Sequence, residues 1–189
     1  MGFSALPDGY LEVRTIDFLK NKKTMILAQV AALVVSIVLI IIGNVVKPFS
    51  LPNSGNFIVD ILIIFAMLLL IVIYVVAHEL VHAFFMKAFS KGKVNFGFNV
   101  LYAFVGSEAY FSKKQYIVIS LAPIILLGFI LLFLNMLVPV EWFWMIYILQ
   151  ITNISGAVGD IYMTALLCWL PADILVKDEG VKMMIYSRK

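Results

Sequence analysis

The sequence predicts an all-α membrane protein with four transmembrane helices, on two observations. Residues of the hydrophobic types make up 63% of the 189-residue chain, whereas a soluble globular domain contains about 45–50%. Four apolar segments are also long enough to cross the roughly 30 Å of hydrocarbon in a bilayer. They cover residues 24–46, 57–87, 116–138 and 142–170. A chain of this length is expected to form a single domain over residues 1–189.

The first and third segments each raise a question. The first segment resembles a signal peptide, but it is too long for one and no small-residue cleavage site follows it, so it is interpreted as a retained span. The third contains Pro123. A proline inside a span either breaks the helix, which would admit water or substrate, or is tolerated as a simple kink.

The distribution of basic residues predicts the orientation. Thirteen of the fourteen Lys and Arg residues lie before the first segment, from the last residue of the second segment (Lys87) up to the third, or after the fourth. The other two connections contain only Lys47. By the positive-inside rule, both termini and the central loop are expected in the cytoplasm. The second and fourth segments then run in the same direction, so the depths of their residues can be compared.

The second segment contains both histidines of the chain, in the sequence HELVH from His78 to His82. Residues i and i+4 share one face of a helix, so the two imidazoles can bind one zinc ion. A water in the open position of such a zinc ion becomes acidic near neutral pH. Glu79 is expected to act on it as general base and then as general acid. The alternative is a polar cluster that only ties helices together.

The third zinc ligand is expected to be Asp160. Asp60 and Asp160 are the aspartates within the apolar segments. Asp60 lies roughly 27 Å above His78 along the helix axis and cannot reach it. Asp160 lies within about one helical turn of the depth of His78. Small residues around Asp160 could simply allow close packing of helices, but a buried aspartate is hard to explain by packing.

Asn153 is the second polar residue of interest in the fourth segment. It precedes Asp160 by seven positions and therefore shares its face in a regular helix, about 10 Å from the metal. Two roles are open at this point. Asn153 either orients substrate or stabilises the oxyanion, or it forms a structural hydrogen bond between helices.

Four stretches follow one another along the chain: LPDGYLEVRTIDFLKNKK, AHELVHAFFMKAF, KKQYIVISLAP and NISGAVGD. In these the chain resembles the small bacterial family called "putative zincin peptidase" and, more distantly, the site-2 intramembrane proteases. The resemblance implies a multi-pass protein of the bacterial cell membrane, with zinc bound by His78, His82 and Asp160. It further implies that Glu79 is catalytic and that Asn153 assists.

The chain departs from the site-2 protease pattern around the third ligand. That pattern has an asparagine, a proline three positions on, and an aspartate followed by glycine eight positions on. Here Gly156 replaces the proline, the spacing is seven, and Ile161 follows Asp160. The local helix geometry around Asp160 is therefore expected to differ.

The central loop, residues 88–115, contains the stretch KVNFGFNVLYAFVGSEAYF. Its Phe, Val and Tyr residues predict two short strands within residues 94–111, joined by a turn at GSE. Glu108 is interpreted as a solvated turn residue. The strands either bind an extended peptide at their edge or rest on the lipid interface. After Pro171, a short cytoplasmic tail is predicted, with a hairpin around KDEG.

These patterns predict a zinc-dependent endopeptidase that cleaves membrane or membrane-adjacent segments near the cytoplasmic face. The expected partners are a membrane protein or peptide substrate and the lipid bilayer, and nucleic acid is not expected. The alternative is a non-catalytic membrane scaffold or metal-binding protein. A transporter is disfavoured, since no repeat of interrupted helices is evident. The lone Cys168 excludes a disulfide framework.

Overall fold

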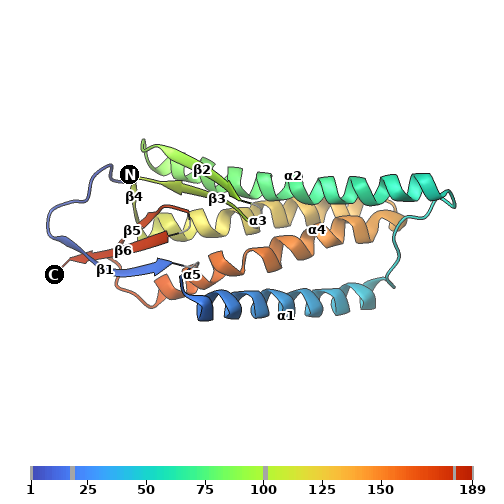
Figure 1. The fold of residues 1–189 in the computed structure, drawn as a ribbon, viewed down its shortest axis with the longest axis horizontal. Coiled ribbons are helices and arrows are strands. Elements are labelled where there is room, and N and C mark those ends of the chain that lie inside the picture. Colours follow the sequence, from blue (N-terminus) through green and yellow to red (C-terminus); the bar gives the residue numbers. More distant parts are fainter. Residues whose placement is uncertain (1, 18–19, 100–101, 181, 189) are drawn as a thin grey trace.

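The computed structural model describes residues 2–17, 20–99, 102–180 and 182–188. Within these residues, four helical segments are long and apolar enough to cross a membrane: α1 (Lys22–Val46), α2 (Phe57–Phe89), α3 (Lys113–Leu137) and the run Val140–Cys168. They form an elongated bundle, and the strands gather at one end of it (Figure 1). The four predicted spans are therefore confirmed, and the chain is a multi-pass membrane protein.

The fourth span is interrupted near its middle. A short 3-10 helix, η1 (Val140–Trp142), leads into α4 (Phe143–Gly156), and α5 (Val158–Cys168) follows after Ala157. The ψ angle of Ala157 is 15°, which is outside the helical range. Glycine has low helix propensity, and Gly156 and Gly159 flank the break. A new helix therefore starts here, with Asp160 in its first turn.

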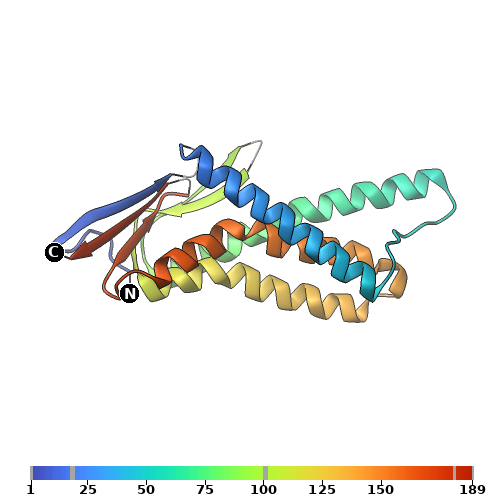
Figure 2. The same cartoon turned by 90° about the horizontal axis from the view of Figure 1, so that it is seen from below.

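Among the described residues, the strands form two antiparallel sheets. The predicted helical architecture is confirmed, and the β-structure is more extensive than the two predicted hairpins. One sheet has the order β1-β6-β5-β4. The other pairs β2 with β3. The strands are β1 (Tyr10–Asp17), β2 (Val94–Asn99), β3 (Tyr102–Ser107), β4 (Tyr110–Ser112), β5 (Leu175–Asp178) and β6 (Lys182–Arg188). The four-stranded sheet lies beyond one end of the helices, and the β2–β3 hairpin lies alongside the helices at the same end (Figure 2).

The two predicted hairpins have different outcomes. The C-terminal hairpin around KDEG is confirmed, because β5 pairs with β6. The central hairpin exists as β2 and β3, but its connection falls at residues 100 and 101, outside the described residues. The predicted turn at GSE is wrong, since residues 106–108 lead from β3 towards β4, a strand of the other sheet. The residues GSE indicate a turn, but their composition does not show which strands the turn joins.

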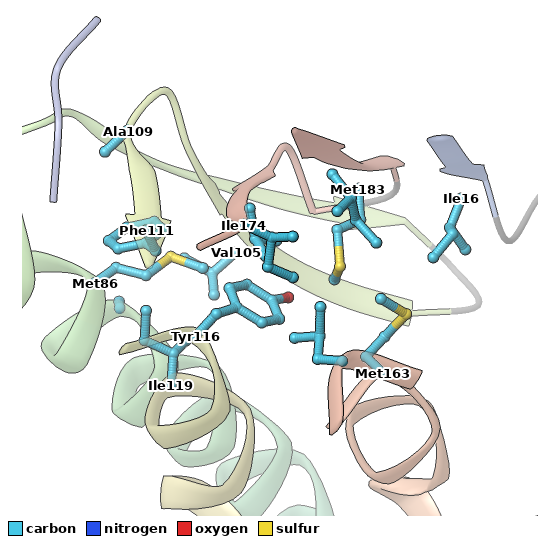
Figure 3. Packing of buried hydrophobic residues seen from close by; sticks show 14 residues of the cluster. Ile16, Met86, Val105, Ala109, Phe111, Tyr116, Ile119, Met163, Ile174 and Met183 are labelled. Carbon is cyan, nitrogen blue, oxygen red and sulfur yellow. The ribbon is translucent and has the colours of Figure 1, made fainter. Parts of the chain in front are cut away.

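A hydrophobic core joins the four-stranded sheet to the ends of the helices. Side chains from α2, α3 and α5 point towards side chains of the strands (Figure 3). Phe111 of β4 and Ile185 of β6 are fully buried there, as is Leu167 of α5. The sheet is therefore packed against the bundle, and the connections between its strands are held close to the helix ends.

Helix α1 is attached to the bundle through α4. The Tyr147 hydroxyl donates to the Leu39 carbonyl at 2.8 Å, and the Trp144 indole N–H donates to the Lys47 carbonyl at 3.2 Å. Gly43 is the buried residue of α1. A Cβ atom at this position would overlap the Tyr147 ring and lie 2.9 Å from Trp144. Close approach of α1 and α4 therefore depends on glycine at position 43.

Gly43→Ala is expected to destabilise the metal-free protein by about 1–3 kcal/mol, the usual cost of overpacking. The Tyr147 ring cannot move aside easily, because its hydroxyl is bonded to Leu39. Thermal unfolding in detergent measures the effect. Gly159→Ala is the control for the helix propensity gained with alanine, since the space around a Cβ there is open. Unchanged unfolding of Gly43→Ala would contradict the close α1–α4 contact.

Candidate metal centre

A pocket of about 290 Å³ lies where the helices meet the strands. Its lining comes from α2, α3, α4 and α5, from β3, and from the turn of the β5–β6 hairpin. His78, Glu79, His82 and Asp160 all line it. The residues predicted from the sequence to bind and activate zinc are therefore brought together in one place.

The two histidines face one carboxylate. His78 and His82 lie on α2 with ring centroids 4.9 Å apart. His78 Nε2 lies 3.4 Å from Asp160 Oδ2, and His82 Nε2 lies 3.6 Å from Asp160 Oδ1. The exposed fractions of the three side chains are only 12%, 10% and 25%. Three good metal ligands thus converge in a largely buried position.

This arrangement fits a tetrahedral zinc ion. Bonds of about 2.0–2.1 Å at tetrahedral angles place ligand atoms about 3.3 Å from one another. The two nitrogen–oxygen distances of 3.4 and 3.6 Å are close to this value, and one ligand atom from each residue lies within 4.8 Å of the others. Two imidazoles and one carboxylate are also the ligand set of many catalytic zinc sites, which keep one position for water.

The orientation of His82 follows from the proline in α3. Pro123 has no N–H, so it cannot donate the helical hydrogen bond to the Ile119 carbonyl four residues before it. His82 Nδ1 lies 2.9 Å from that carbonyl oxygen. A carbonyl only accepts, so Nδ1 carries the proton and Nε2 keeps its lone pair for a metal. Pro123 lies inside a continuous α3, so of the two alternatives for this residue the structure favours a proline that the helix tolerates.

On the Nδ1 side of its ring, His78 contacts Tyr74, and Tyr74 in turn contacts Asn153. His78 Nδ1 lies 3.1 Å from the Tyr74 hydroxyl, which donates to Asn153 Oδ1 at 2.7 Å. Asn153 Nδ2 in turn donates to the Ile124 carbonyl of α3 at 3.0 Å. Asn153 is fully buried and lies behind His78. These contacts favour the interhelix hydrogen bond over direct contact with substrate, and the catalytic role of Asn153 stays a prediction.

Glu79 shares the pocket with the histidines but follows His78 directly on α2. Consecutive helical residues point in directions about 100° apart, so Glu79 stands beside the ligand pair. Glu79 is partly buried. A base next to a site for an activated water is the arrangement that metal-assisted hydrolysis needs.

Several residues of the site were not predicted from the sequence. Asp178 lines the pocket from the β5–β6 hairpin and accepts hydrogen bonds from the Tyr116 hydroxyl and from the Gly180 N–H. Burial raises the pKa of the Asp178 carboxyl above its ordinary value. In the sequence it appears as a turn residue of KDEG. Tyr74, in contrast, precedes His78 by four positions, and this helical spacing is a signal that could have identified it.

Four helices that are apolar enough to span a membrane, together with a His–His–Asp group that could hold a metal ion, are the features expected of an integral membrane metalloprotein. A family model described as "Putative zincin peptidase" matches residues 70–175, more than half of the chain, and the chain belongs to this family. The matched range includes His78, Glu79, His82 and Asp160. Membership supports a zinc metallopeptidase with zinc as its metal. No curated protein and no solved structure matches the chain.

Proposed function

We propose that the chain is a membrane-embedded zinc endopeptidase that cleaves membrane or membrane-adjacent segments of proteins. The observation that supports this most is the convergence of His78, His82 and Asp160 in the pocket that Glu79 also lines. A site that only stores a metal has no need of a base beside its ligands. A hydrolase needs one.

His78, His82 and Asp160 would hold the zinc ion, which when bound supplies Lewis-acid chemistry: it polarises a carbonyl group and acidifies water. Glu79 accepts the proton of the water that attacks the peptide carbonyl. It then delivers this proton to the amide nitrogen as the carbon–nitrogen bond breaks. The products are a carboxylate and an amine. Val75 and Met86 in the pocket wall limit the access of further water, which strengthens these electrostatic interactions.

The proposed location of cleavage is the cytoplasmic end of the helices. His82 lies seven residues before the end of α2 at Phe89, which is about 10 Å along the axis. The four-stranded sheet lies beyond this end and the β2–β3 hairpin lies alongside it (Figure 1). Thirteen of the fourteen basic residues belong to the sequence segments predicted to be cytoplasmic or to the helix ends next to them. The positive-inside rule places such an end in the cytoplasm. Water and a peptide would therefore enter from that side.

Strand β3 is the proposed binding edge for an extended substrate. It pairs with β2 along one edge, and among the described residues no other strand pairs with it. Ala103, Phe104 and Val105 of β3 line the pocket. A peptide added to this strand would have its backbone held in the same pocket as Glu79. The alternative, that the hairpin rests on the lipid interface, predicts no effect of β3 substitutions on cleavage.

Metal removal tests the proposed function. The purified full chain in lipid vesicles is expected to retain about one zinc ion and to cut co-reconstituted membrane proteins, because water activation needs the metal. A chelator should abolish the new peptide termini detected by mass spectrometry, and zinc, but not magnesium, should restore them. Cleavage that persists without metal would contradict the proposal. Bound zinc without any cleavage would support the non-catalytic scaffold.

A further inference from the structure

We infer that Tyr74 and Asn153 are positioning residues that fix the tautomer of His78, and that the backbone of α3 sets this orientation. The inference rests on the proposed zinc site and deepens it. It follows from the hydrogen bonds that connect α2, α4 and α3 behind the metal centre.

The first step fixes the amide of Asn153. The Ile124 carbonyl can only accept a hydrogen bond, so the atom that faces it at 3.0 Å must be Nδ2. A flipped amide would place two acceptors against each other. The position is also tightly enclosed, since a Cβ on Gly128 would lie 2.9 Å from Nδ2. Oδ1 of Asn153 therefore points towards Tyr74.

The second step passes this orientation to the histidine. The Tyr74 hydroxyl has one proton, and Asn153 Oδ1 receives it at 2.7 Å. The hydroxyl oxygen can then only accept from His78 Nδ1, which lies 3.1 Å away. Nδ1 of the neutral imidazole therefore carries the proton, and Nε2, the atom that faces Asp160, keeps its lone pair for a metal.

The tautomer of His82 is fixed in the same way, but by one hydrogen bond and without intervening side chains. Its Nδ1–H donates directly to the Ile119 carbonyl of α3, which Pro123 leaves without a helical donor. Both histidines are thus oriented by carbonyl groups of α3, one directly and one through Tyr74 and Asn153. The metal centre on α2 is therefore expected to respond to changes in α3 and α4 that touch neither the ligands nor the substrate.

Tyr74→Phe tests this inference, because it keeps the ring and removes only the hydroxyl. Loss of the partner that orients a ligating histidine typically weakens metal binding by about 10–100-fold, and this is the expected effect on the zinc affinity. The measurement is a competition titration of the purified full chain with a chromophoric chelator. The visible spectrum of the cobalt-substituted protein provides a second readout of ligand geometry.

Tyr147→Phe is the matched control. Tyr147 also donates its hydroxyl across a helix interface, to the Leu39 carbonyl at 2.8 Å, but this bond joins α4 to α1 away from the pocket. Its loss is expected to leave the zinc affinity unchanged. Equal weakening of zinc binding by Tyr147→Phe and Tyr74→Phe would indicate a general loss of helix packing and would overturn the inference.

A double-mutant cycle tests whether Tyr74 and Asn153 act on zinc binding through one chain of hydrogen bonds, here called the relay, or independently of each other. In Asn153→Ala, the Tyr74 hydroxyl loses its acceptor and can donate to His78 Nδ1, which favours the wrong tautomer. Zinc binding should therefore weaken in this variant too. In Tyr74→Phe/Asn153→Ala there is no hydroxyl left that could donate to His78 Nδ1. The zinc affinity of the double variant should therefore be at least as high as that of the single variant with the lower affinity. Losses that multiply would contradict the relay.

Gly128→Ala provides an independent approach from α3 if the Tyr74 variant is poorly folded. The added methyl group pushes against Asn153 Nδ2 and should weaken zinc binding while Tyr74 and His78 are intact. Wild-type zinc affinity in both Tyr74→Phe and Gly128→Ala would overturn the inference. A wild-type chain that binds no zinc would instead contradict the proposed function, so the two failures are distinguishable.

Discussion

Glu79→Gln is expected to abolish peptide cleavage and to leave zinc bound. Glutamine has nearly the same size and shape as glutamate, but it cannot accept a proton at neutral pH. General acid–base catalysis contributes about 10²–10⁴-fold to a rate, and Glu79 serves in both proton transfers of the proposed reaction. His78, His82 and Asp160 are unchanged in this variant, so the metal site should remain intact.

The measurement combines metal analysis with the detection of new peptide termini. Glu108→Gln is the control: it is the same substitution at an exposed residue between β3 and β4, and it should leave both readouts at the wild-type level. Proteolysis that survives Glu79→Gln in a pure, metal-loaded preparation would show that the mechanism is wrong. A comparison of membrane proteomes with wild-type and Glu79→Gln protein would also identify the substrates.

The part of the site predicted from the sequence is the part that rests on helix geometry. The i, i+4 spacing predicts that His78 and His82 share a face, and the length of the spans predicts the depth of Asp160. Both arguments use only the rise and pitch of a helix. They succeed because a helix confined to a membrane has few other ways to place its residues.

Two hairpins were predicted, but the four-stranded sheet β1-β6-β5-β4 was not, because the pairings that complete it are non-local. The stretch YLEVRTID alternates apolar and polar residues as an edge strand does, yet its partner, β6, is at the other end of the chain, with Tyr10 opposite Arg188. No local pattern reveals such pairing. Asp178 was missed for the same reason, since the packing of β5 beside β4 is what brings it to the pocket.

The interruption of the fourth span affects how Asn153 and Asp160 are placed at the site. In an unbroken helix, Asn153 and Asp160 share one face, and both would be expected to point at the metal. Because the helix breaks at Ala157, the two residues lie in different helices and face different groups. Asp160 faces the histidines from the first turn of α5, whereas Asn153 is buried behind His78 at the end of α4. At the proposed zinc site, one polar stretch would therefore supply both a ligand, Asp160, and a residue that supports another ligand, Asn153.

Asp160→Ala is expected to remove zinc binding almost completely. Asp160 faces both histidines, at 3.4 and 3.6 Å, and its removal leaves two of the three protein ligands that a catalytic zinc site requires. The loss should exceed the about 10–100-fold expected when only a partner of a ligand is removed. Asp160→Ala should therefore bind zinc more weakly than Tyr74→Phe in the same competition titration.

Asp60→Ala is the matched control, because it removes the other aspartate within a span. Asp60 lies about 27 Å from His78 along α2 and accepts hydrogen bonds from the Ser54 N–H and hydroxyl at 2.8 and 2.9 Å. Its loss should loosen the connection between α1 and α2 without changing the zinc content. Wild-type zinc content in Asp160→Ala would remove Asp160 from the ligand set. Glu79 would then be the nearest acidic candidate on α2 for the third ligand, and a residue that binds the metal could not also serve as the base.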